Sequence, residues 1–121
     1  MFEVINKAVL ESIKLPTRFL NKLERDLEYI FKSNINSLEL IVLFGSCVNG
    51  KLKVTSDIDL LIITHEKIEQ FIKGDIASML DEPIESVTTD AIFYTIDEIR
   101  TGNSMFIQQV LKEGVVIWTK G

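Results

Sequence analysis

Two aspartates separated by one residue have the clearest chemical potential in this 121-residue chain. Asp57 and Asp59 begin the apolar segment DIDLLIIT, which predicts a buried β-strand. Because side chains alternate along a strand, both carboxylates fall on one face, with Cα atoms about 6.6 Å apart. Carboxylates this close repel each other without a cation, and Mg²⁺ takes such oxygen ligands and shares them with substrate phosphates. The pair therefore predicts a site for Mg²⁺ and a phosphate.

A glycine and a serine after the preceding apolar segment supply the other half of such a site. The segment LELIVLF, Leu38 to Phe44, predicts a strand that stops at Gly45 and Ser46. The connection to the first aspartate is near the minimum length for a parallel crossover, so we expect antiparallel neighbours. Glycine lets a phosphate approach the backbone, serine adds a donor, and a short helix starting here would attract anions. Two lysines in the connection add positive charge, Lys51 and Lys53.

A rival interpretation comes from the same residues. Gly45 to Lys51, GSCVNGK, matches the first seven positions of the phosphate-binding loop G-x-x-x-x-G-K-[ST]. The eighth position is Leu52, which lacks the hydroxyl group that binds Mg²⁺ in that loop. A helix must also follow the lysine, and the apolar run from Ile58 leaves no room for one. The sequence therefore favours the Gly-Ser and Asp-x-Asp interpretation.

The N-terminal third predicts two helices. A weak helical pattern covers residues 2–14, Pro16 breaks it, and Thr17 is expected to cap a second helix that runs to about residue 33. We expect charged side chains such as Lys22 to lie mostly off the apolar face of that helix. Its apolar stripe consists of Leu20, Leu23, Leu27, Ile30 and Phe31.

The remaining segments complete a small sheet with helices. A helix is predicted over residues 68–80, a third strand over 87–94, and a fourth strand over 115–118. Thr95 and Glu98 form a capping box for a short helix, and Gly114 is expected to end the last helix. The order predicts an α/β (α+β) fold with a small mixed sheet of about four strands flanked by helices.

Composition bounds the class of protein. Hydrophobic residues make up 46% and charged residues 26%, as in globular proteins, so we expect a single domain over 1–121 with N-terminal helices 2–33 and a motif-bearing core 38–118. The net charge of −5 argues against strong nucleic-acid binding. The single cysteine, Cys47, forms no internal disulfide. We find no signal peptide and no membrane-spanning run, and expect a cytoplasmic protein without a membrane partner.

The motif resembles that of the nucleotidyltransferase superfamily that includes DNA polymerase β. Its signature is an apolar strand, Gly-Ser, a spacer of ten residues here, and Asp-x-Asp on the next strand. The resemblance covers about Leu38 to Trp118 and implies a polymerase β-like nucleotidyltransferase fold. It also implies a third carboxylate, matched by Asp90, whereas Asp75 and Asp81 fit less well because they lie in or after a helix. One departure is the turn CVNG, where relatives often have x-A-R-G.

The chain also looks like the minimal members of this superfamily that act as antitoxins beside a HEPN-domain ribonuclease toxin. The resemblance implies transfer of AMP from ATP to a tyrosine of that partner. It implies that the catalytic aspartates hold two Mg²⁺ ions, with a glycine, a serine and lysines on the nucleotide. The implied site comprises Asp57, Asp59 and Asp90 as catalytic and metal-binding residues, and Gly45, Ser46, Lys51 and Lys53 as nucleotide-binding residues.

Two alternatives remain open from the sequence. A catalytically weak or inactive protein could neutralise its partner by covering it, and binding of Mg²⁺–ATP would distinguish that case. A nucleotidyltransferase could instead act on a small molecule or an RNA end. The sequence leaves open which nucleotide is used, what the acceptor is, and whether the chain forms a homodimer.

Overall fold

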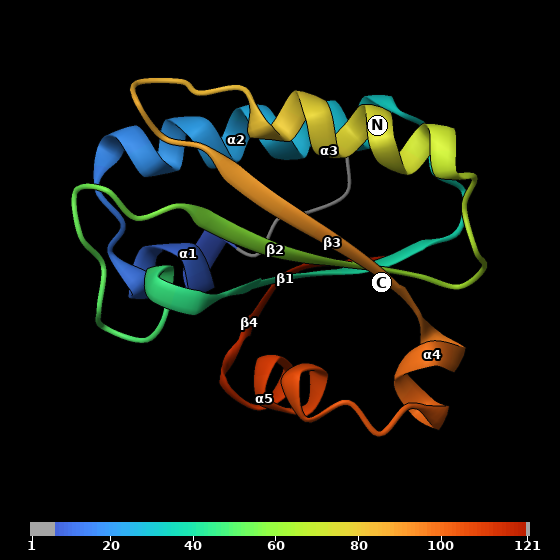
Figure 1. Ribbon diagram of the computed structural model, residues 1–121. Helices are drawn as coiled ribbons and strands as arrows, with labels where there is room; N and C mark the ends of the chain where they lie inside the picture. The colour runs from blue at the N-terminus through green and yellow to red at the C-terminus, as the bar shows by residue number, and fades with distance from the viewer. Residues whose placement is uncertain (1–6, 121) are drawn as a thin grey trace.

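A four-stranded mixed sheet organises the computed structural model, which describes residues 7–120 (Figure 1). The strands are β1 (Leu38–Phe44), β2 (Ile58–Thr64), β3 (Thr89–Thr95) and β4 (Val115–Thr119), in the order β3-β2-β1-β4. Strand β1 pairs antiparallel with both β2 and β4, whereas β2 and β3 are parallel. The predicted fold class and the antiparallel pairing of the first two strands are confirmed.

Helices cover both faces of this sheet. On one face, α2 (Thr17–Lys32) and α3 (Gln70–Asp81) pack over the strands, and α1 (Lys7–Ile13) lies beside β4 (Figure 1). On the other face lie α4 (Ile96–Thr101) and α5 (Met105–Glu113). A short 3₁₀ helix, η1 (Gly45–Cys47), follows β1. The two layers explain why the central strands read as nearly continuous apolar runs.

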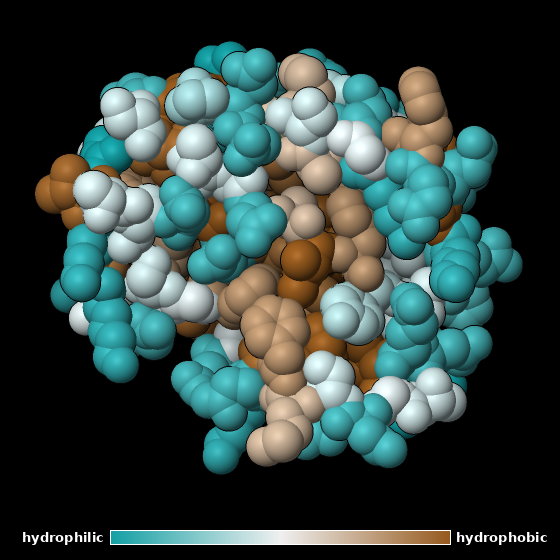
Figure 2. Space-filling view, viewed as in Figure 1, coloured by the Kyte–Doolittle hydropathy of each residue, from teal (hydrophilic) through white to brown (hydrophobic). Residues whose placement is uncertain are grey.

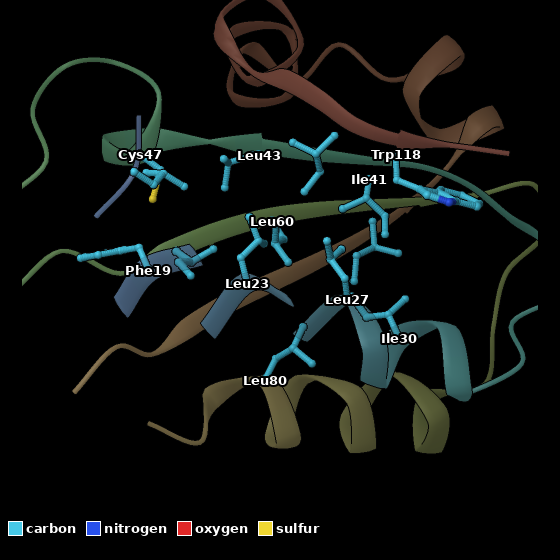
Figure 3. Packing of buried hydrophobic residues seen from close by; sticks show 14 of the residues in the cluster. Phe19, Leu23, Leu27, Ile30, Ile41, Leu43, Cys47, Leu60, Leu80 and Trp118 are labelled. Atoms are coloured by element: carbon cyan, nitrogen blue, oxygen red, sulfur yellow. The ribbon is translucent and has the colours of Figure 1, made fainter. Parts of the chain in front are cut away.

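The larger core lies between the sheet and α2 with α3. Alternate residues of β1 and β2 point into it, among them Leu43 and Leu60, and meet Leu23 and Leu27 of α2 (Figure 3). Trp118 of β4 is buried in the same core, beside the Phe31 ring at 5.5 Å between centroids. The opposite residues of the strands form a second cluster with α5: Val42, Leu61, Ile63, Ile107 and Val110.

Some helix ends differ from the sequence prediction. The predicted start of the first helix, residues 2–6, lies outside the described residues, and α1 is seen from Lys7. The expectation that Thr17 caps α2 is wrong, because Pro16 holds the N-cap position and makes no side-chain cap bond. The extended backbone of Pro16 already presents its carbonyl to two amides of the first turn. The capping box of Thr95 and Glu98 and the helix end at Gly114 are confirmed.

Lys22 is buried, which corrects the expectation that it lies off the apolar face of α2. Its ammonium group donates to Asp26 Oδ1 at 2.5 Å, to the Leu80 carbonyl at 2.6 Å and to Thr89 Oγ1 at 3.0 Å. The Thr89 hydroxyl donates to the other oxygen of Asp26. The spacing of Lys22 and Asp26 places both on the helix stripe that faces the sheet. This network joins α2, the end of α3 and the start of β3.

The outer surface is mostly polar, as Figure 2 shows for one face. Apolar side chains gather through the middle of that face, over the sheet. Among the helices of residues 7–120, none combines the length and the hydropathy needed to cross a bilayer.

Candidate active site

The three aspartates singled out from the sequence come together at one end of the sheet. Asp59 of β2 and Asp90 of β3 are register partners, so their side chains are neighbours on one face. Asp57 precedes β2 and lies two residues from Asp59, as the alternation predicts. We call these residues the carboxylate cluster. Asp59 is half-buried, whereas Asp57 and Asp90 are exposed.

The electrostatics of the carboxylate cluster are unfavourable for three negative charges. Burial, and then the charges of Asp90 and Asp57, raise the pKa of the Asp59 carboxyl to about 6. Like charges without a nearby cation disfavour ionisation in this way. A bound divalent cation would reverse the effect, since it favours the ionised carboxylate.

Gly45 packs directly against Asp59. Phe44, the last residue of β1, is the register partner of Asp59, so the chain turns beside that carboxylate. Gly45 has a φ of 74°, and a Cβ atom built on it would collide with Asp59 Oδ2. Gly50 has a similar φ of 80°, yet nothing lies within 4 Å of its added Cβ. Glycine is therefore required at position 45 both by the backbone and by the carboxylate.

The Gly-Ser turn, residues 45–50, contains η1 and keeps the chain tight beside β2. The Gly45 carbonyl accepts from the amides of Val48 and Asn49, at 3.0 and 3.1 Å. Ser46 is half-buried within η1. The structure therefore places Gly45 against Asp59, with Ser46 as the next residue of the turn.

The two lysines predicted to bind the nucleotide lie on an exposed loop rather than in the Gly-Ser turn. Lys51 and Lys53 are exposed on the loop between the Gly-Ser turn and β2. Their backbone amides donate to Asn49 Oδ1 and Ser56 Oγ, which shapes the loop. Within residues 7–120, neither ammonium group makes a hydrogen bond or an ion pair. The structure leaves both lysines free to meet a ligand but does not bring them against the aspartates.

Thr88 belongs to the site, although sequence reasoning gave it no role. Its hydroxyl donates to Asp57 Oδ1 at 2.6 Å and so fixes the carboxylate that precedes β2. The signal was present in the strand alternation, which puts Thr88 on the same face as Asp90. Next along the chain, Thr89 points into the opposite layer and bonds Lys22 and Asp26. The start of β3 is thus held from both faces.

Cys47 packs within the Gly-Ser turn. Its side chain is buried, and Sγ donates a weak hydrogen bond to the Asp57 carbonyl at 3.8 Å. Burial and the charges of Asp59 and Asp57 raise the pKa of the thiol to about 12. The thiol therefore stays protonated near neutral pH.

The carboxylate oxygens of this cluster suit a Mg²⁺ ion that arrives bound to a nucleotide. Across residues 7–120, no three His, Cys, Asp or Glu side chains are arranged to hold a metal by themselves. Mg²⁺ seldom uses such a cage, because it binds through one or two carboxylates, waters and substrate phosphates. Asp59 and Asp90 provide those oxygens. They are neighbours on adjacent strands, and their mutual repulsion favours binding of a cation.

The fold and the arrangement of the motif define a nucleotidyltransferase-type domain. The family model "Polymerase beta, Nucleotidyltransferase" matches residues 25–121. The chain therefore belongs to the polymerase β nucleotidyltransferase family.

Known proteins support this family assignment. "Protein adenylyltransferase MntA" of Shewanella oneidensis is 27% identical over 89 residues, which cover 74% of this chain and 60% of that relative's length. A toxin–antitoxin crystal structure with AMP-PNP is 25% identical, with a TM-score of 0.58 over 79% of this chain and 73% of that one. A crystal structure described as that of a nucleotidyltransferase from Sulfolobus solfataricus shares the fold. It has 24% identity and a TM-score of 0.61, over 92% of this chain and 86% of that chain.

Proposed function

We propose that this protein transfers AMP from ATP to a hydroxyl group of a partner protein, a tyrosine of a HEPN-domain toxin. The observation that carries the proposal is the carboxylate cluster against Gly45, since Asp59 faces Asp90 across two strands and contacts the Gly-Ser turn. Family membership supports the reaction type. The relatives described as a protein adenylyltransferase and as a toxin–antitoxin complex with AMP-PNP support the donor and the partner.

In the proposed site, the carboxylate cluster holds Mg²⁺. Bound there, Mg²⁺ neutralises phosphate charge and polarises the reacting oxygens. Asp59 would hold the ion together with Asp90, because it contacts the Gly-Ser turn on one side and faces Asp90 on the other. Thr88 keeps Asp57 oriented through its hydrogen bond.

The nucleotide lies along the Gly-Ser turn in this proposal. Gly45 brings the backbone close to the phosphates, and Ser46 adds a hydroxyl donor. Lys51 and Lys53 add positive charge from the exposed loop. The acceptor hydroxyl attacks the α-phosphorus, a new P–O bond forms, the bond to the β-phosphate oxygen breaks, and pyrophosphate leaves.

The proton of the acceptor hydroxyl goes to Asp90. This residue is exposed and lies on β3, the outer strand of the sheet beside β2. An acceptor from another protein can approach such an edge, whereas β2 is flanked on both sides. Most of the rate enhancement comes from positioning and charge neutralisation.

The direct test uses ATP labelled at the α-phosphate, Mg²⁺ and lysate of the source cell, with products separated by size. Wild-type protein is expected to label a protein band, and the Asp57→Asn/Asp59→Asn variant to label nothing. Label on RNA or a small molecule would contradict the protein acceptor while keeping the transfer chemistry. No label with any of the four nucleoside triphosphates would contradict the transfer itself and favour a partner-covering protein.

A further inference from the structure

The guanidinium group of Arg18 joins two loops that precede the carboxylate cluster. Arg18 lies in the first turn of α2 and is half-buried. Its Nη2 atom donates to the Val54 carbonyl at 2.6 Å, and its Nη1 atom donates to the Glu85 carbonyl at 3.2 Å. Both loops lie at the end of the sheet where α2 begins (Figure 1). One side chain therefore holds together two loops that are distant in the sequence.

Each of these loops is a tight turn closed by its own hydrogen bonds. In the first, residues 53–56, the last amide donates to the first carbonyl at 3.0 Å. In the second, residues 84–87, the first and last residues exchange amide-to-carbonyl bonds at 3.0 and 2.9 Å. The two middle residues of the second turn have positive φ, as in a two-residue hairpin turn. Because each turn is closed internally, the contacts between the turns set their relative position.

The two turns lead directly into the residues of the site. Asp57 follows the first turn, and Thr88 follows the second, two residues before Asp90. The Thr88 hydroxyl donates to Asp57 Oδ1 at 2.6 Å, and the Thr88 carbonyl accepts from the amide of Ile58 at 3.0 Å. The two chain segments are thus tied at the site by Thr88 and just before the site by Arg18.

The chemistry of Arg18 suits a brace between two backbone segments. A guanidinium group is a planar fork with donors on both terminal nitrogens, whereas an ammonium group has a single nitrogen. The carbon at the centre of the fork lies 4.8 Å from the centre of the Phe19 ring, and the Phe19 side chain is buried. This contact with the ring helps to fix the fork. Arg18 also precedes residue 25, where the match to the family model begins.

We propose that Arg18 is a positioning residue that sets the spacing of Asp57 and Asp90 for Mg²⁺. The inference rests on the proposed function, because it requires Mg²⁺ and a nucleotide at the carboxylate cluster. Groups that orient metal ligands change the affinity for the metal even when they do not touch it. Removing the brace weakens Mg²⁺ binding more than it weakens the fold, because water can bond the two carbonyl groups that are released.

The test measures ATP binding by calorimetric titration of the full chain at a series of Mg²⁺ concentrations, and thermal unfolding of each variant in EDTA. Arg18→Met removes both donors and keeps an apolar stem beside Phe19. Arg18→Lys keeps the charge and loses the fork, so it separates the two roles. The control is Arg25→Met, an exposed arginine about two helical turns further along α2.

Both Arg18 variants are expected to raise the Mg²⁺ concentration for half-maximal ATP binding about tenfold, and to regain the wild-type ATP affinity at saturating Mg²⁺. Their Tm should fall by about 5 °C or less, since two hydrogen bonds at the surface contribute little. Arg25→Met should match the wild type in both measurements.

An unchanged Mg²⁺ dependence in Arg18→Met would overturn the inference, as would ATP affinity that stays low at saturating Mg²⁺. Wild-type behaviour of Arg18→Lys would also overturn it, because the charge alone would then be enough. Arg18 variants that do not fold would show that the residue serves the fold as a whole and not the site. In all these cases the wild type still binds ATP with Mg²⁺ and the proposed function stands, whereas a wild type that does not bind would overturn both.

Discussion

Asp59 loses solvation and faces two other carboxyl groups, so its ionised form is unfavourable in the absence of a cation. Its pKa of about 6 lies above the ordinary value of 3.8. A raised pKa in the folded state means that the folded protein binds a proton that the unfolded chain releases. The resulting loss of stability is absent below about pH 4, grows as the pH rises, and is complete above about pH 6.

Asp59→Asn is therefore expected to stabilise the protein near pH 7.5 in EDTA. We expect a rise in Tm of roughly 2–4 °C, because half-exposure of the group reduces the effect. The gain should shrink as the pH is lowered from 6 toward 4, as thermal unfolding can show. With Mg²⁺ and a non-hydrolysable ATP the order should reverse, since ligand binding stabilises the wild type alone. A variant less stable than the wild type in EDTA would contradict this account.

Alanine variants of Gly45 and Gly50 test the contact with Asp59, because the two glycines share a backbone conformation and only Gly45 has this contact. Both have positive φ, so alanine costs about 1–2 kcal/mol of backbone strain at either position. At position 45 alone, the added Cβ also displaces Asp59. Gly45→Ala should abolish Mg²⁺–ATP binding, whereas Gly50→Ala should lower stability and keep binding; titration and thermal unfolding measure the two effects. Equal binding by the two variants would show that the contact with Asp59 is unimportant.

At the scale of elements, a buried ion pair fixes the strand that carries Asp90. Lys22 and Asp26 on α2 both bond Thr89, the residue before Asp90. The same helix carries an exposed pair at the same spacing, Lys32 and Glu28, which are 3.0 Å apart. The two pairs differ in burial and in the further hydrogen bonds of Lys22 to Leu80 and Thr89, so the comparison separates a buried charge network from a surface contact.

Lys22→Met should destabilise the protein by about 3–5 kcal/mol, because Asp26 remains buried without its cation. Lys32→Met should cost no more than about 1 kcal/mol, since exposed pairs contribute little. Denaturant unfolding of both variants gives the comparison. Similar small losses for the two would mean that the buried network does not hold β3 in place.

The elements also show which features the sequence can predict. The apolar runs of β1 and β2 identified both strands within a residue of their ends, because central strands are apolar on both faces. The antiparallel pairing followed from the short connection. Lys22 was misplaced because a charged residue is usually exposed, and only its hydrogen bonds in the fold explain its burial.

The candidate site was predictable to a similar degree. Alternation and the family motif pointed to the carboxylate cluster, and the structure brings its members together. The register between β2 and β3 depends on how α3 connects them, so the exact pairing of Asp59 with Asp90 could not be known beforehand.

At the scale of the whole molecule, the site lies where three parts of the chain meet. The Gly-Ser turn follows β1, Asp59 lies at the start of β2, and Asp90 lies on the outer strand β3. Cores on both faces of the sheet hold these parts in place, while Asp57 and Asp90 remain exposed. A rigid sheet with chemistry at its edge suits a reaction that depends on positioning.

The central claim is that the carboxylate cluster performs nucleotidyl transfer. The most direct measurement is the rate of label transfer from α-labelled ATP to the proposed protein acceptor by single variants of Asp57, Asp59 and Asp90 to asparagine. Asp81→Asn, an exposed aspartate at the end of α3, is the control. We predict a loss of at least about 100-fold for each of the three and a wild-type rate for the control. Transfer retained by Asp59→Asn would contradict the claim.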